Sequence, residues 1–117
     1  MKLTGGMMMN NIELIKAFAR IEGVVIVIVG KAPYIEDINP TFTIRMPYNP
    51  ITDLALNCAA RDKHKVDVDY LDNDMANVEM WHRAADLLAM IECCSVSDIP
   101  RAVIECIVKA HGGDSNE

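Results

Sequence analysis

The sequence has few aromatic residues and fewer basic residues than acidic ones. Aromatic residues make up 5% of its 117 residues, whereas hydrophobic residues make up 51%. The core must therefore consist mainly of aliphatic side chains, and this apolar content excludes an intrinsically disordered chain. Eleven Lys and Arg residues stand against seventeen Asp and Glu residues, which gives a formal net charge of −6. This balance argues against sequence-independent binding to nucleic acid, because such binding needs a basic surface.

Long hydrophobic runs are also missing. The longest one, Val24–Val29, is far shorter than a helix that crosses a membrane. Residues 1–9 lack the apolar stretch and cleavage site of a secretory signal, so we expect the cysteines to be reduced thiols in the cytoplasm. We expect residues 1–9 to be a disordered or misassigned start, residues 10–112 a single α+β domain, and residues 113–117 a polar tail.

Helix signals occur at several places in the sequence. Asn10 begins a capping-box pattern, and Gly23 can end the helix that follows. Asn49 and Pro50 suit the N-cap and the first turn of a second helix. In residues 75–94 apolar residues recur at intervals of three and four, which is typical of an amphipathic helix. The expected helices span residues 11–22, 50–64, 75–94 and 98–111.

The strand signals are a β-branched run and two alternating segments. Val24–Val29 contains only Val and Ile, which is typical of a strand covered on both faces, so we expect it to be the central strand. Residues 30–40 contain Gly and Pro and are expected to form a loop. In residues 41–46 and 66–70 the alternation directs the even-numbered side chains toward the core. The predicted fold is one small α+β domain with about four helices around a short three-stranded sheet, a helix–sheet–helix sandwich.

Five acidic residues gather within thirteen positions of the sequence. Their spacing does not match a calcium-binding loop. A solvated strand face followed by a turn explains them most simply. They can also form a ridge that binds a basic surface of a protein partner. The residues of this candidate partner-binding set are Asp67, Asp69, Asp72, Asp74 and Glu79.

A second candidate set combines cationic side chains with the single tryptophan. Guanidinium and aromatic groups hold phosphates and bases, so this set predicts an alternative function, the sequestration of a small nucleotide-type signalling ligand by an oligomer. The wide apolar face of residues 75–94 would supply the contact of a homodimer. The residues of this ligand-binding set are Arg45, Arg61, Lys63, Lys65 and Trp81.

Catalytic and metal-binding motifs are missing. The sequence has neither Gly-x-Ser-x-Gly nor His-Glu-x-x-His, and Gly30-Lys31 lacks the spacing of a phosphate-binding loop. Its four cysteines do not form a Cys-x-x-Cys pair, so we expect them to be small core thiols and not zinc ligands. We therefore expect a non-enzymatic protein with no metal and no cofactor.

Three stretches resemble small accessory proteins of tailed bacteriophages, those of the phage ABA sandwich type. They are YNPITDLAL at residues 48–56, RDKHKVDVDY within residues 61–70, and PRAVIECIVKA at residues 100–110. The resemblance implies a helix–sheet–helix sandwich, and the family commonly has strands in place of residues 75–94.

The same resemblance implies a protein that binds and inhibits a host protein in the cytoplasm of an infected bacterium, such as a CRISPR effector. Proteins that process nucleic acids have basic channels, which an acidic surface can occupy. We thus expect a protein partner of this kind, with no direct contact to nucleic acid or membrane.

Overall fold

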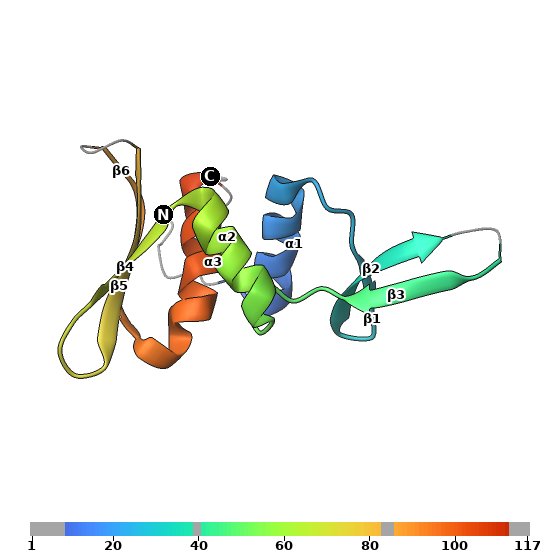
Figure 1. The fold of residues 1–117 in the computed structure, drawn as a ribbon, viewed down its shortest axis with the longest axis horizontal. Coiled ribbons are helices and arrows are strands. Elements are labelled where there is room, and N and C mark those ends of the chain that lie inside the picture. Colours follow the sequence, from blue (N-terminus) through green and yellow to red (C-terminus); the bar gives the residue numbers. More distant parts are fainter. Residues whose placement is uncertain (1–8, 39–40, 83–85, 113–117) are drawn as a thin grey trace.

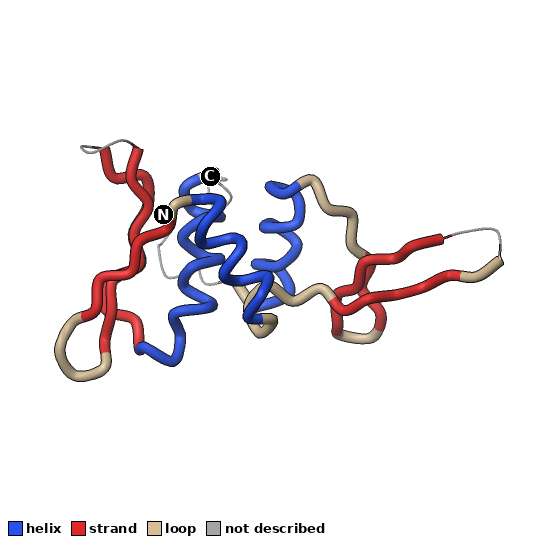
Figure 2. The backbone as a smooth tube through the Cα atoms, in the orientation of Figure 1, coloured by secondary structure: helices blue, strands red, loops and turns tan. Residues whose placement is uncertain are grey.

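The computed structural model describes residues 9–38, 41–82 and 86–112, and within them three α-helices lie between two separate antiparallel sheets (Figure 1). Figure 2 shows the helices in the middle and one sheet on either side. In chain order the elements are α1 (Asn11–Glu22), β1 (Val27–Val29), β2 (Ala32–Ile38), β3 (Thr43–Pro47), α2 (Leu54–His64), β4 (Val66–Tyr70), β5 (Met75–His82), β6 (Asp86–Ser95), the 3-10 helix η2 (Val96–Asp98) and α3 (Ile99–Ala110).

The chain is α+β, but the predicted sandwich of about four helices around one three-stranded sheet is wrong. Residues 1–8 of the expected start and the whole expected tail, residues 113–117, lie outside the described residues.

Helix α1 begins and ends where the sequence predicts. The Asn10 side chain accepts a hydrogen bond from the backbone N–H of Glu13 at 2.8 Å, and the Glu13 carboxylate accepts one from the Asn10 N–H at 3.3 Å. Gly23 ends the helix with φ at 71°, a left-handed conformation that is inexpensive for glycine. The helix buries Leu14 and Phe18 in the core and packs against α3.

Helix α3 packs against both other helices and the sheet of β4, β5 and β6. Its predicted position is confirmed, although Asp98 makes no capping hydrogen bond with its side chain. Val103, Ile104 and Ile107 are 0% exposed. Because burying one aliphatic side chain stabilises a fold by roughly 1.5–3 kcal/mol, α3 contributes much of the core energy.

Helix α2 begins at Leu54 and not at Pro50. Asp53 is the N-cap, since its side chain accepts hydrogen bonds from two backbone N–H groups of the first turn at 3.1 and 3.3 Å. The Asn49 side chain caps a separate turn, where it accepts hydrogen bonds from two backbone N–H groups at 3.1 and 3.2 Å. Leu54 and Cys58 on this helix are exposed.

The inner face of α2 is instead formed by Ala60 and the buried polar residue Asn57. The Asn57 side-chain amide donates hydrogen bonds to the backbone carbonyls of Pro50 at 2.8 Å and Pro100 at 2.9 Å. These two bonds join α2 to the turn before it and to the start of α3.

Strands β4, β5 and β6 form the sheet that covers α3, in that order. The predicted strand over residues 66–70 is confirmed, but the helix predicted over residues 75–94 is wrong, because this segment folds into the β5–β6 hairpin. Ala76, Val78 and Met80 alternate along β5 and are buried on its inner face. Docking on α3 therefore overrides the helical spacing, and the homodimer contact expected of that helix loses its basis.

Strands β1, β2 and β3 form an arm that extends away from the helices (Figure 1). The prediction that Val24–Val29 is a buried central strand is wrong: only Val27–Val29 pairs, at the edge of the arm. Gly30 turns the chain with φ at 66°, and the next residues form β2, the central strand, where a loop is expected. A six-residue run of β-branched residues thus gives only a short edge strand: Val24 and Ile26 pack against the core, and the last three residues alone pair with β2.

Strand β3 occupies nearly the predicted segment, but its expected inward residues are not buried. Phe42, Ile44 and Met46 are 52%, 42% and 53% exposed. Among the described residues no second layer covers this part of the arm (Figure 1). The alternation therefore identifies the strand correctly but not its burial.

Candidate functional site

The candidate site is the outer face of the sheet formed by β4, β5 and β6, opposite the face that packs on α3. Because side chains alternate along a strand and Val66 and Val78 point inward, their neighbours point outward. Asp67 lies directly opposite Glu79, and Asp69 lies opposite Asn77. No other described element covers this face (Figure 1). We call it the acidic face: Asp67, Asp69, Asn77, Glu79 and Trp81.

Two more acidic residues lie in the tight turn between β4 and β5. Asn73 and Asp74 have φ values of 64° and 58°, and the Leu71 N–H donates to the Met75 carbonyl at 2.8 Å. Asn and Asp tolerate this left-handed conformation better than other non-glycine residues, which explains their place in the turn. Asp72 therefore lies beside Asp74 at the tip of the hairpin, and the β4–β5 hairpin carries all five predicted acidic residues.

The electrostatics of the acidic face are unfavourable. Like charges directly opposite each other on neighbouring strands destabilise a sheet, and Asp67 and Glu79 form such a pair. Within the described ranges no Lys, Arg or His forms an ion pair with Asp67, Asp69 or Glu79. As far as the described residues go, the face thus presents uncompensated negative charge.

An exposed apolar patch continues the acidic face at one end. Trp81 is 39% exposed, and its indole N–H donates to the Glu79 carboxylate at 3.0 Å, which fixes the ring beside the acids. Leu87 lies opposite Trp81 on β6, and Leu88 forms the bulge next to it; both are exposed. The sequence prediction missed these leucines because it placed them on the apolar face of a helix. The alternation of apolar and polar residue types over residues 76–80 was the available signal for a strand.

The second predicted set is not brought together. Arg45 lies on β3 in the arm, where it pairs with Glu36 at 2.9 Å. Trp81 lies on β5, at the other end of the molecule (Figure 1). Only Arg61, Lys63 and Lys65 are close in the chain, at the end of α2.

Lys63 belongs to a cluster that joins α1 to α2. The Glu22 carboxylate accepts from the Lys63 ammonium at 2.9 Å and lies 2.7 Å from His64 Nε2. Burial alone would raise the pKa of Glu22, but the hydrogen bonds from His64 and Lys63 outweigh it and hold the pKa below its ordinary value. The His64 ring also packs edge-on against the rings of Phe18 and His111. The position of this cluster between two helices indicates a structural role.

The cysteines differ in environment. Cys106 on α3 is a core thiol, as expected: its sulfur lies 3.5 Å from the Ala89 carbonyl and 3.7 Å from that of Val78, and burial raises its pKa to about 12. Cys58 and Cys93 are exposed, which corrects the expectation that they belong to the core. Among the residues that the structure describes, no three His, Cys, Asp or Glu side chains are placed to hold a metal ion.

The chain matches no family model, no curated protein and no solved structure. The resemblance to phage ABA sandwich proteins therefore stays a prediction. In the described ranges no helix is long and apolar enough to cross a lipid bilayer.

Proposed function

We propose that the protein is a non-enzymatic binding protein whose acidic face docks on a basic surface of another protein. The observation that carries the proposal is the like-charged pair of Asp67 and Glu79 beside the exposed Trp81. A basic partner would turn this unfavourable arrangement into a favourable one, because its cations would neutralise both carboxylates.

The geometry suits an arginine of the partner in particular. A guanidinium can stack on an indole ring and at the same time form two parallel hydrogen bonds with a carboxylate. Trp81 and Glu79 offer these two groups side by side, since one is hydrogen-bonded to the other. Leu87 and Leu88 add apolar area next to them, and Trp and Arg are frequent anchors of protein interfaces.

For the partner we propose a host protein that processes nucleic acids, with the acidic face occupying its basic channel. In this proposal the protein is a phage accessory protein that inhibits a defence complex, for example a CRISPR effector, in the cytoplasm of the infected cell. The phage resemblance suggests the source, and the excess of acidic residues supports a basic target. The nucleotide-sequestering alternative lacks a common site, since Arg45 and Trp81 lie at opposite ends of the molecule.

A binding titration with a matched charge control tests the acidic face. The probe is a fluorescein-labelled peptide rich in arginine, and its anisotropy reports binding at several salt concentrations. We expect the double variant Asp67→Asn, Glu79→Gln to bind roughly tenfold more weakly and with a smaller salt dependence. The control, Asp37→Asn with Asp62→Asn, removes the same charge from exposed positions elsewhere. Equal losses in both variants would show a general charge effect and contradict the proposal.

A second experiment tests the partner class. Wild type and the Asp67→Asn, Glu79→Gln variant are each immobilised and exposed to a bacterial lysate. We expect nucleic-acid-processing proteins to be retained by wild type and lost from the variant. Retention of the same proteins by both forms would contradict the proposal that the acidic face binds the partner.

A further inference from the structure

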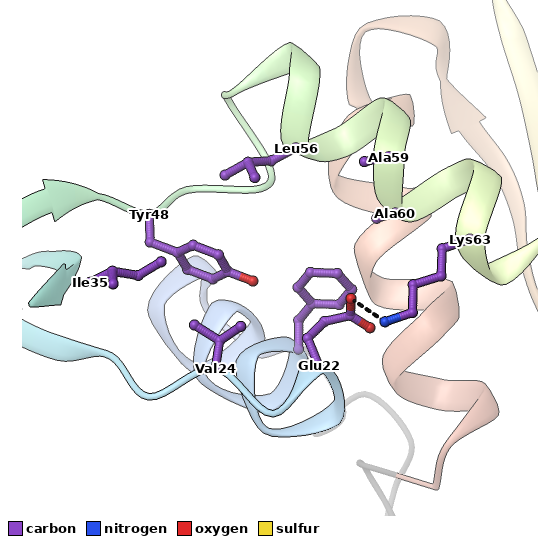
Figure 3. A pocket seen from close by; sticks show the side chains of 9 residues that line it. Glu22, Val24, Ile35, Tyr48, Leu56, Ala59, Ala60 and Lys63 are labelled. Carbon is purple, nitrogen blue, oxygen red and sulfur yellow. Dashed lines mark hydrogen bonds and ion pairs between the residues drawn. The ribbon is translucent and has the colours of Figure 1, made fainter. Parts of the chain in front are cut away.

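A cavity of about 310 Å³ lies on the arm side of the helices, where α1, α2 and the base of the arm meet (Figure 3). Val24, Ile35, Leu56 and Ala59 make most of its wall aliphatic. Its size and apolar lining are those of a small ligand site. None of the residues that line the cavity belongs to the acidic face. A ligand in this cavity is therefore independent of the proposed function.

Besides the ion pair of Glu22 and Lys63, one neutral polar side chain lines this cavity. Tyr48 follows β3 directly, is only 5% exposed, and directs its hydroxyl into the cavity (Figure 3). Among the described residues no buried side-chain oxygen or nitrogen lacks a partner, so this hydroxyl, for which no hydrogen bond to another described residue is seen, is reached by solvent through the cavity. A ligand oxygen in the cavity can accept a hydrogen bond from this hydroxyl in place of water. The cavity therefore offers one neutral donor beside an apolar wall.

The charge of the surrounding groups limits what can occupy this position. Burial raises the pKa of Tyr48, and the negative charge of Glu22 raises it further, so the hydroxyl stays protonated and acts as a donor. Both carboxylate oxygens of Glu22 already bind, one to Lys63 and one to His64. The aliphatic walls disfavour any charged ligand, and the two ionic side chains of the wall, Glu22 and Lys63, already pair with each other. An uncharged molecule with a hydrogen-bond acceptor fits these conditions.

We propose that the cavity binds a small, uncharged, largely apolar molecule whose oxygen accepts a hydrogen bond from Tyr48. A longer apolar substituent can continue onto the arm, because Ile35 in the cavity wall lies opposite Met46, which is on the same face of the arm and exposed. In this proposal the exposed apolar side of the arm forms the outer part of the binding site.

Two probes of almost the same shape test the hydrogen bond. Acetophenone and α-methylstyrene differ only in having a carbonyl oxygen or a methylene group, and dissociation constants follow from amide chemical-shift titrations. We expect wild type to prefer acetophenone by roughly three- to tenfold, the usual effect of one neutral hydrogen bond. In Tyr48→Phe, which keeps the ring, the preference should disappear. An unchanged preference in Tyr48→Phe, or no binding of either probe by wild type, would overturn the proposal.

A pair of variants on α2 tests the location. Ala59→Arg places a long side chain at an exposed position of the cavity wall, and we expect it to abolish binding of both probes. Leu54→Arg is the matched control, because Leu54 is 73% exposed on the same helix but does not line the cavity. Thermal unfolding of both variants verifies that they are folded. Loss of binding in Leu54→Arg with retention in Ala59→Arg would place the probes outside the cavity and overturn the inference.

Discussion

The two three-stranded sheets have the same antiparallel order of strands but different surroundings. The sheet of β4, β5 and β6 lies on α3 and buries Ala76, Val78 and Met80. The arm of β1, β2 and β3 extends from the helices and leaves Ile44 and Met46 exposed. The comparison shows that alternation along a strand offers an apolar face, whereas a neighbouring element decides whether that face is buried.

The two sheets also differ in the charges that face each other across neighbouring strands. In the arm Glu36 lies opposite Arg45 and pairs with it at 2.9 Å. On the acidic face Asp67 lies opposite Glu79, and the charges repel. The sheet with little packing has the favourable pair, and the well-packed sheet carries the unfavourable one. Packing on α3 thus supplies stability that offsets the repulsion on the acidic face.

The largest expected difference concerns burial. Val78→Asp would place a carboxylate in the core beside α3, so we expect it to lower the free energy of unfolding by at least about 3 kcal/mol. Ile44→Asp in the arm should cost less than about 1 kcal/mol, because water already reaches that position. Urea denaturation of the two variants measures both values. Similar costs would mean that the arm is as well packed as the other sheet.

The next effect concerns the helices to which both sheets attach. Asn57→Ala removes both hydrogen bonds from the side-chain amide and leaves the Pro50 and Pro100 carbonyls without that donor. We expect a loss of about 1–3 kcal/mol in the free energy of unfolding. Cys58→Ala, at an exposed neighbouring position, is the control and should have little effect. A loss of equal size in the control would contradict the role of Asn57.

The cluster on the arm side of the helices should make stability depend on pH. The folded-state pKa of Glu22 is below its ordinary value of 4.5, so its contribution is present above that value and is lost as pH falls toward the folded pKa. Glu22→Gln removes this contribution. The difference in free energy of unfolding between wild type and Glu22→Gln should therefore shrink below pH 4.5. A difference that stays constant from neutral to acid pH would contradict this assignment.

The smallest effects sharpen the comparison of charges. Asp67→Asn should stabilise the protein by about 0.2–1 kcal/mol, because it removes repulsion from Glu79. Glu36→Gln in the arm should destabilise by a similar amount, since it removes the attraction to Arg45. Both effects should diminish at high salt, because the charges are at the surface. Denaturant titrations at low and high salt measure the change in the free energy of unfolding for each variant. Changes of the same sign in both variants would contradict the charge difference between the sheets.

Local signals predicted some elements well. The capping box at Asn10, the glycine at residue 23 and the alternation of residues 66–70 depend on neighbours in sequence, and the structure contains the corresponding helix and strand. Residues 75–94 were predicted wrongly because their apolar spacing fits a helix, while docking on α3 favours the β5–β6 hairpin. The acidic residues were found as a set, but the pairing of Asp67 with Glu79 depends on the register of that hairpin.

The sequence by itself determined an acidic, aliphatic chain with the capped helix α1, the amphipathic helix α3 and the strand β4, because capping, helical spacing and alternation act over a few residues. Tertiary structure alone decided which apolar faces are covered and which side chains meet across strands. It also directed Tyr48 into a cavity whose wall comes from α1, β2 and α2. The physical reason is that burial and cross-strand contacts join segments far apart in the chain. A local sequence pattern does not specify which distant segment a residue will contact.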